Sequence, residues 1–218
     1  DAYILGKNLD ENELPKGMVS ILPAGRAVGE YLVRHPGVDK VAFTGSTAAG
    51  RRVGAICGEH LKRCTLELGG KSAAIILDDA DLEAIMPMLM GTALMNNGQA
   101  CIAQTRILAS RDRYDEVVDA LRDAVAATTV GDPTDPSVAV GPLVAERQRD
   151  RVLGYIEKGR EEGAKVAVGG GRPEGLDKGW YVEPTLFVDV DNRMTIAREE
   201  IFGPVLAVLP YEDVDEAV

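Results

Sequence analysis

The 218-residue chain is predicted to be an α/β protein with a largely parallel sheet. Short apolar runs, many of them β-branched, alternate along the sequence with longer stretches of helical periodicity. Turns rich in glycine and proline separate these runs. The composition agrees, because 45% of the residues are hydrophobic and 27% are charged, as in globular rather than disordered proteins.

The predicted elements follow from these patterns. Strands are expected over residues 18–23, 40–44, 64–68, 73–77, 105–109, 180–190 and 205–211. Helices are expected over residues 1–9, 48–60, 82–95, 114–127, 147–162 and 195–200. In 114–127, for example, Val117, Leu121 and Val125 recur every four residues. Asp81 is the predicted N-cap of the helix over 82–95, and residues 130–136 and 169–178 are predicted turns.

Both ends of the chain are predicted to lie inside helices. Residues 1–9 have a helical pattern from the first residue onward. A second helical pattern begins within residues 211–218 and is cut short by the end of the sequence. Domains usually begin and end in exposed linkers. The sequence therefore predicts a piece of a longer protein.

Charge and composition exclude several classes of function. The net charge is −11, and no run of basic residues exceeds two, so nucleic acid is not an expected partner. No apolar stretch reaches the roughly 18 residues of a membrane helix, and the first residues lack the features of a signal peptide. Three cysteines do not suit a disulfide framework, so we expect a cytoplasmic protein. With His35 and His60 as the two histidines and no Cys-x-x-Cys, no metal site is expected.

Cys101 is the first candidate for chemistry. It ends the motif Asn-Gly-Gln-Ala-Cys, just after a helical pattern that breaks at Gly98, so its thiol is expected on a loop at a helix end. Partial exposure and nearby backbone N–H groups favour a reactive thiolate. The competing interpretation is a small buried hydrophobic residue, the usual state of a free cysteine. Cys57 and Cys64 have no comparable setting and are both assigned to the core.

Glu67 is the second candidate. It lies between Leu66 and Leu68 at the end of a predicted strand, and two glycines follow it. A charge among apolar neighbours is costly to bury unless it is paired, and glycine permits close backbone approach. A carboxylate in partly apolar surroundings suits a general base. The competing interpretation is that the strand alternates sides and points Glu67 to solvent.

A third segment runs from a predicted strand through Gly45 and Ser46 into a helix, with the sequence Phe-Thr-Gly-Ser-Thr-Ala-Ala-Gly over residues 43–50. It places free N–H groups and a hydroxyl at a helix N-terminus, where an anion is favoured. It departs from the Gly-x-Gly-x-x-Gly dinucleotide fingerprint, and an ordinary N-cap after a buried strand is the competing interpretation. A fourth segment, Arg-Glu-Glu-Ile-Phe-Gly-Pro-Val over residues 198–205, is by itself a helix terminus.

Together these segments resemble the aldehyde dehydrogenase superfamily. The family's two signatures, Glu-x-Gly-Gly-Lys from Glu67 to Lys71 and Gly-Gln-x-Cys ending at Cys101, stand in the family's order and spacing. The third and fourth segments match two further stretches, and the resemblance covers essentially the whole chain. It implies that 1–69 is the back part of a Rossmann-like dinucleotide-binding domain. It implies that 70–218 is most of an α/β catalytic domain, incomplete at its C-terminus, that carries the thiol.

The resemblance implies oxidation of a small-molecule aldehyde to a carboxylic acid with NAD or NADP. Cys101 would attack the aldehyde carbon as a thiolate, and its own N–H would help to hold the oxyanion. Hydride transfer to the dinucleotide would leave a thioester, and Glu67 would activate the water that releases the acid. Lys71 belongs to the signature, but it is assigned no chemical role.

The resemblance also implies the cofactor contacts. Gly45 and Ser46 would contact the pyrophosphate, and Leu68 is a further expected cofactor-binding residue. Glu200 would bond the nicotinamide ribose, and Phe202 would pack at the nicotinamide end. The resemblance also implies that the full-length protein is a homo-oligomer, either a dimer or a tetramer.

The sequence lacks other parts that the resemblance implies. The family's second oxyanion donor, an upstream asparagine, and its lysine for the adenine ribose fall outside these 218 residues. We therefore expect the isolated chain to turn over poorly or not at all.

Other interpretations stay open. In a CoA-acylating enzyme of the same family, coenzyme A would take the acyl group, and the water-activating Glu67 would have no purpose. A binding or structural protein with this fold is a second alternative. A cysteine hydrolase is a third, but neither His35 nor His60 stands in a catalytic context. Ala100 and Ile102 beside the thiol favour an uncharged aliphatic or aromatic aldehyde.

Overall fold

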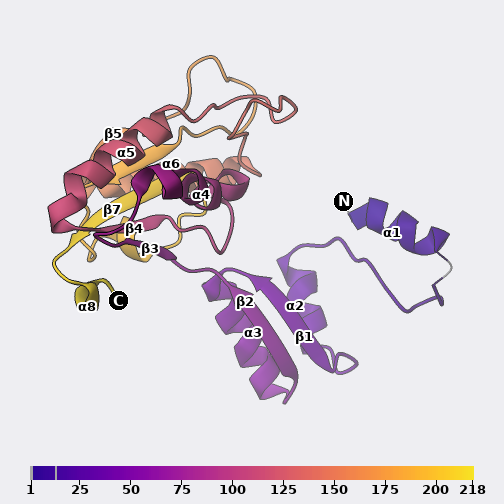
Figure 1. The fold of residues 1–218 in the computed structure, drawn as a ribbon. Helices are drawn as coiled ribbons and strands as arrows, with labels where there is room; N and C mark the ends of the chain where they lie inside the picture. The colour runs from indigo at the N-terminus through magenta and orange to yellow at the C-terminus, as the bar shows by residue number, and fades with distance from the viewer. Residues whose placement is uncertain (1, 13) are drawn as a thin grey trace. The chain divides into compact units, whose positions relative to one another are not determined.

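The computed structural model describes residues 2–12 and 14–218 (Figure 1). The chain divides into two compact units, Asp1–Leu68 and Gly69–Val218, and each unit has a sheet of its own. The expected helix over 1–9 is present as α1, Ala2–Glu11, and Asp1 lies outside the described residues.

The first unit contains a β-α-β arrangement. Its elements are α1 (Ala2–Glu11), α2 (Arg26–Arg34), β1 (Lys40–Gly45), α3 (Thr47–Glu59) and β2 (Arg63–Leu68). Strands β1 and β2 are parallel, from Lys40 opposite Arg63 to Gly45 opposite Leu68, and α3 is the crossover between them. Gly50 of α3 is buried, and a Cβ there would overlap the Leu68 side chain. The glycine therefore lets α3 approach the end of β2 closely.

Two predictions for the first unit are wrong. Residues 18–23 form no strand, and Met18 and Leu22 are 64% and 62% exposed. A strand needs the N–H and C=O groups of a neighbour, and in the described part of the chain β1 and β2 pair only with each other. Cys57 is buried as predicted, but Cys64 is exposed. Cys64 lies near the start of β2, where a two-stranded sheet with one covering helix leaves its end open to solvent.

The second unit is a three-layer α/β structure. Its elements are β3 (Ala73–Ile76), α4 (Leu82–Ala93), the 3-10 helix η1 (Met95–Gly98), β4 (Arg106–Ser110), the 3-10 helix η2 (Arg111–Arg113), α5 (Tyr114–Ala126), α6 (Glu146–Glu161), β5 (Lys165–Val168), β6 (Thr185–Val188), α7 (Thr195–Arg198), β7 (Val205–Tyr211) and α8 (Val214–Ala217). The sheet order is β3-β4-β7-β6-β5, and all neighbours are parallel except β5 and β6. The predicted α/β class with a largely parallel sheet is confirmed.

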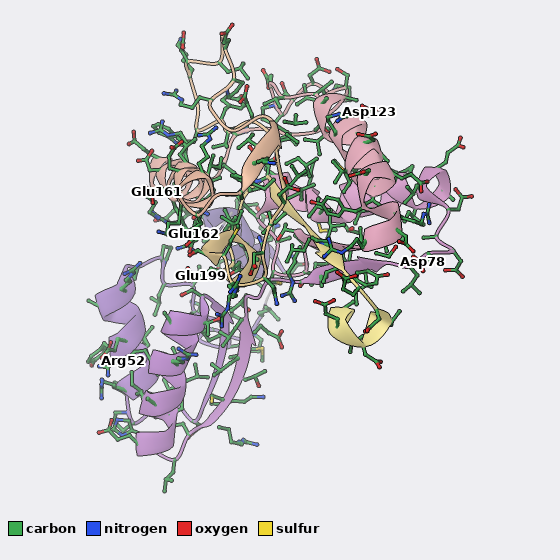
Figure 2. All side chains as sticks on the ribbon, turned by 90° about the vertical axis from the view of Figure 1, so that its left-hand side faces the viewer. Arg52, Asp78, Asp123, Glu161, Glu162 and Glu199 are labelled. Carbon is green, nitrogen blue, oxygen red and sulfur yellow. The ribbon has the colours of Figure 1, made fainter. Side chains whose placement is uncertain are left out.

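Alternate residues of the central strand β7 serve two cores. Leu206 and Val208 pack with apolar residues of α4 and α5. Val205, Ala207 and Leu209 pack with residues of α6 and α7 on the other face. Burial on both faces explains why this strand is a continuous apolar run. The outer surfaces of the helices are charged, as Asp123 on α5 and Glu161 on α6 show in Figure 2.

The strand predicted over 180–190 is present only as β6. The residues before β6 bond to loops, since the Trp180 carbonyl accepts from the Leu143 N–H and the Glu183 N–H donates to Gly171. Pro184 has no N–H to offer to a ladder. The helix α2, the strand β5 and the two 3-10 helices η1 and η2 are not among the predicted elements. The predicted N-cap is confirmed, because the Asp81 carboxylate accepts from the Ala84 N–H at 3.1 Å.

No helix in the described ranges combines the length and the apolar character needed to cross a membrane.

Candidate active site

The Cys101 thiol lies in the turn after α4 and η1 and is exposed to solvent. This agrees with the predicted loop at a helix end. The next side chain, Ile102, is 60% exposed, whereas Ala103 is buried and anchors the end of the turn. Among the described residues, no acceptor takes the backbone N–H of Cys101. The turn therefore presents a thiol and an unused N–H donor side by side.

The backbone before Cys101 has an unusual conformation. Asn96, Asn97 and Gly98 follow one another with φ of 49°, 60° and 73°, all in the left-handed region. Asparagine and glycine are the residues that tolerate this region best. Three such residues in succession end the helical path of α4 and turn the chain toward Cys101.

Two side-chain amides hold this thiol loop, residues 96–101, against the segment 141–144. The Asn97 Oδ1 accepts from the Gly141 N–H at 2.8 Å, and its Nδ2 donates to the Pro142 carbonyl at 3.1 Å. The Gln99 Oε1 accepts from the Val144 N–H at 3.1 Å, and Gln99 is 8% exposed. These hydrogen bonds are part-buried, and a group shielded from water is costly to leave without its partner. No role is predicted for these amides from the sequence, although they stand in the glycine-containing motif that predicts the loop.

Gly98 also packs the thiol loop against a second segment of backbone. It is buried, and a Cβ at Gly98 would overlap the Gly203 carbonyl. A Cβ at Gly203 would in turn overlap Val152 of α6. Both glycines therefore permit a close approach that any side chain would prevent.

Helix α6 holds the segment that contains Glu200 and Phe202. Phe202 has φ 63°, an uncommon conformation for a residue of its size. The Gln148 Nε2 donates to the Phe202 carbonyl at 2.8 Å, and the Arg151 Nη2 donates to the Glu200 carbonyl at 2.7 Å. These bonds fix the backbone from which both predicted cofactor-binding side chains project.

The Glu200 carboxylate lies against the backbone of Gly69, where a Cβ would overlap both of its oxygens. Its Oε1 is buried and has no hydrogen-bond partner in the described part of the chain. Buried polar atoms are normally paired. An acceptor left in this state suits the hydroxyl of a ligand.

In the first unit, Ser46 is the N-cap of α3, and its Oγ accepts from the Ala49 N–H at 3.3 Å. Gly45 precedes it at the end of β1, and a Cβ there would lie 2.6 Å from the Phe43 ring. The Ser46 hydroxyl keeps its own proton to donate, and the N-terminus of a helix of this length favours an anion. The strand before it is only partly buried, contrary to the buried strand considered from the sequence.

Glu67 is exposed on β2, opposite Thr44 in the register. Leu66 and Leu68 are half-buried, so strand alternation places Glu67 on the other face of the sheet. The partly apolar surroundings expected for this carboxylate are therefore absent within the first unit. Glu67 belongs to the first unit and Cys101 to the second.

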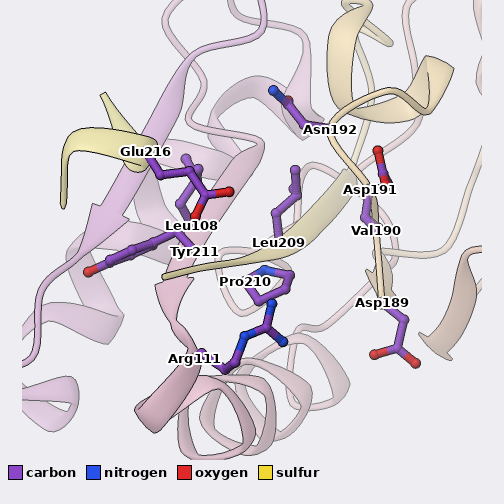
Figure 3. A pocket seen from close by; sticks show the side chains of 10 residues that line it. All are labelled: Leu108, Arg111, Asp189, Val190, Asp191, Asn192, Leu209, Pro210, Tyr211 and Glu216. Carbon is purple, nitrogen blue, oxygen red and sulfur yellow. The ribbon is translucent and has the colours of Figure 1, made fainter. Parts of the chain in front are cut away.

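A separate pocket of about 470 Å³ lies in the second unit (Figure 3). Its charged side chains already have partners: Lys165 pairs with Asp189 at 2.8 Å, and Arg193 pairs with Asp191 at 2.7 Å. Arg111 pairs with Glu212 at 2.5 Å. None of the residues predicted for the site lines this pocket, and we assign it no chemistry.

The second unit is therefore an α/β structure that presents an exposed cysteine thiol on a hydrogen-bonded loop. Comparison with known proteins identifies the family. The model of the aldehyde dehydrogenase family matches residues 1–218. Geranial dehydrogenase of Castellaniella defragrans is 55% identical over 218 residues, all of this chain and 45% of that protein. Betaine aldehyde dehydrogenase of Brucella anthropi is 45% identical over 219 residues, with the same coverage of the two chains.

A solved structure agrees with these relatives. The crystal structure of Mycobacterium tuberculosis aldehyde dehydrogenase complexed with NAD+ superimposes with a TM-score of 0.96 at 55% identity, covering 99% of this chain and 44% of that one. The chain belongs to the aldehyde dehydrogenase family. It spans less than half the length of the curated relatives it matches.

The packing of Gly98 gives the first testable prediction. In the full-length polypeptide that carries this sequence, Gly98→Ala should lower the thermal unfolding midpoint and change the rate at which iodoacetamide alkylates Cys101. The added methyl would meet the Gly203 carbonyl from a backbone with φ of 73°, a strain of about 1–3 kcal/mol. Gly91→Ala in α4 is the matched control, since a Cβ there meets no atom within 4 Å. Equal behaviour of the two variants would contradict the close-packing argument.

Proposed function

We propose that the protein carrying this chain oxidises an aldehyde to a carboxylic acid with NAD+ or NADP+, with Cys101 as the nucleophile and Glu67 as the general base. The observation that supports this most directly is the exposed thiol on a loop locked by Asn97, Gly98 and Gln99. Family membership supplies the class of reaction.

The first step uses the thiolate of Cys101. Its Sγ forms a bond to the aldehyde carbon, and the electron pair of the C=O bond moves to the oxygen. The Cys101 N–H, which no acceptor takes among the described residues, is available to donate to that oxyanion. The locked loop keeps sulfur and N–H in a fixed relation, so little reorganisation is needed during the attack.

The residues fit a dinucleotide in two places, one in each unit. Gly45 and Ser46 would hold the pyrophosphate side, where the α3 N-terminus favours an anion, and Leu68 would be a further cofactor contact. Glu200 and Phe202 would hold the nicotinamide side, where the unpartnered Glu200 Oε1 suits a ribose hydroxyl. When bound, NAD+ or NADP+ supplies the acceptor for the hydride that leaves the substrate carbon, which remains as a thioester on Cys101. We propose that residues 1–69 are part of a dinucleotide-binding domain that also carries the base Glu67, and that 70–218 are most of a catalytic domain that also contributes Glu200 and Phe202 to the cofactor site.

Glu67 would complete the cycle. Its exposed carboxylate is accessible to water, and it would take a proton as the water oxygen bonds to the thioester carbon. The carbon–sulfur bond then breaks, the acid leaves, and the thiolate of Cys101 is restored. In the CoA-acylating alternative, the thiol of coenzyme A would replace this water.

Cys101→Ala in the full-length polypeptide should abolish formation of reduced dinucleotide, because no group remains to bond the aldehyde carbon. Cys64→Ala is the matched control, since Cys64 is likewise exposed, and it should keep near-normal activity. The measurement is reduced-dinucleotide absorbance with octanal as substrate. Equal activity of the two variants would rule out the proposed nucleophile.

Glu67→Gln should separate the two halves of the reaction. We expect about one equivalent of reduced dinucleotide per Cys101 in a rapid burst, followed by a steady state slower by about 10²- to 10⁴-fold, because hydrolysis of the thioester lacks its base. The exposed Glu174→Gln variant is the control and should show normal turnover. A burst-free loss of activity would argue against this role, and turnover that requires coenzyme A would favour the acylating alternative.

The side chains beside the thiol favour an apolar aldehyde. Ala100 and the 60% exposed Ile102 offer no counter-charge to a cationic substrate. Of the relatives, one is named for geranial and another for betaine aldehyde. We propose that this protein resembles the former in substrate class.

Accordingly, kcat/KM should be higher for octanal than for betaine aldehyde by at least about tenfold, since an unpaired cation is costly to desolvate. The two substrates are compared at the same dinucleotide concentration. A preference for betaine aldehyde would contradict the proposed substrate class.

A further inference from the structure

Lys71 is the residue of the Glu-x-Gly-Gly-Lys signature to which the proposed mechanism gives no task. Its Nζ is buried and has no hydrogen-bond partner within residues 2–12 and 14–218. Burial lowers the pKa of Lys71 to about 7, the nearby Arg106 guanidinium acts in the same direction, and the Glu200 carboxylate acts in the opposite one. An amine in this state is close to balance between its charged and neutral forms at physiological pH.

Lys71, Arg106 and Glu200 form a cluster in which three buried atoms have no hydrogen-bond partner among the described residues. Besides the Lys71 Nζ, these are the Arg106 Nε and the Glu200 Oε1. The chain brings them together from separate segments, because Arg106 begins β4 and Glu200 follows α7. Arg106 is held at both ends: its backbone N–H donates to the Ser72 carbonyl at 3.2 Å, and its Nη1 donates to Asn192 at 3.2 Å.

This arrangement is difficult to explain by folding stability alone. Each buried polar atom without a partner costs about 1–3 kcal/mol, and more if it is charged. A cluster that served only to stabilise the fold would pair the ammonium with the carboxylate directly. Here the Glu200 carboxylate instead lies on the Gly69 backbone, two residues before Lys71, with Oε1 unused. The geometry suits a carboxylate kept ready for a donor from outside the chain.

We propose that Lys71 is a positioning residue: the charge on its buried amine holds the Glu200 carboxylate against Gly69, with Oε1 in place for a hydroxyl of the nicotinamide ribose. This rests on the proposed function, in which Glu200 makes that ribose contact. Arg106 is a second cation near Lys71, and its charge disfavours the charged form of the amine. Gly69 contributes by its missing side chain, since any Cβ would displace the carboxylate.

Because the charge on Lys71 depends on pH, the proposed role predicts that dinucleotide affinity depends on pH as well. The amine is charged below about pH 7 and loses its proton as the pH rises through that value. The charged groups that act on Lys71 are Arg106 on β4 and Glu200 after α7. The attraction on Glu200 should therefore weaken between about pH 6 and about pH 9, and dinucleotide affinity with it.

The test is a double-mutant cycle on the full-length polypeptide, read as the dissociation constant for NAD+ by calorimetry without aldehyde. Lys71→Met should raise that constant by about 10- to 100-fold, and Glu200→Gln should raise it similarly. The double variant should bind no more weakly than Glu200→Gln alone, because Lys71 acts through Glu200. Lys178→Met, at an exposed lysine, is the control. Affinity of the unmodified protein should fall with rising pH, whereas that of Lys71→Met should not.

The outcomes distinguish the two proposals. An unchanged constant in Glu200→Gln overturns the ribose contact itself, and the role of Lys71 with it. A weakened Glu200→Gln together with an unaffected Lys71→Met, or with additive effects in the double variant, overturns only the role of Lys71. Lys71→Gln serves as a second neutral variant if Lys71→Met fails to fold, and the pH profile of the unmodified protein needs no substitution. A profile flat across this range contradicts the proposal.

Discussion

The close contact between the Gly98 and Gly203 backbones is the constraint on which the thiol site of the second unit depends. The contact requires a missing side chain and a left-handed backbone at Gly98, and the missing side chain of Gly203 lets the same segment approach Val152 of α6. It joins the loop that ends at Cys101 to the segment that carries Glu200 and Phe202. Any change that separates these backbones would displace both the candidate nucleophile and the candidate ribose contact.

Polar side chains secure the same two segments from outside. Asn97 and Gln99 bond to the 141–144 segment, while Gln148 and Arg151 of α6 bond to the backbone of residues 200–202. These bonds are satisfied, in contrast to the unsatisfied Lys71, Arg106 and Glu200 cluster. Among the described residues, the side chains that secure these two segments have hydrogen-bond partners, whereas three buried atoms of the charge cluster have none. That contrast is the physical basis for assigning the cluster a role toward a ligand.

Most of the fold can be predicted from the sequence where buried residues or a capping residue form a recognisable pattern within one short segment. The apolar run at β7 is continuous because Leu206 and Val208 face one core and Val205 and Ala207 the other, and Asp81 marks the start of α4 by its own hydrogen bond. Residues 18–23 have the apolar pattern of a strand but no neighbour to pair with in the described chain. Pairing partners lie far apart in the sequence, so composition alone cannot supply them.

The family, the α/β class and the loop position of Cys101 follow from the sequence alone, because they depend on motifs and periodicity within short segments. The tertiary structure decided what those residues touch. It showed that Glu67 is exposed where apolar neighbours had suggested partial burial, since alternation on β2 turns it away from Leu66 and Leu68. It also brought Lys71, Arg106 and Glu200 into one charge cluster. Electrostatic coupling falls with distance in space rather than along the chain, so only the folded arrangement could reveal it.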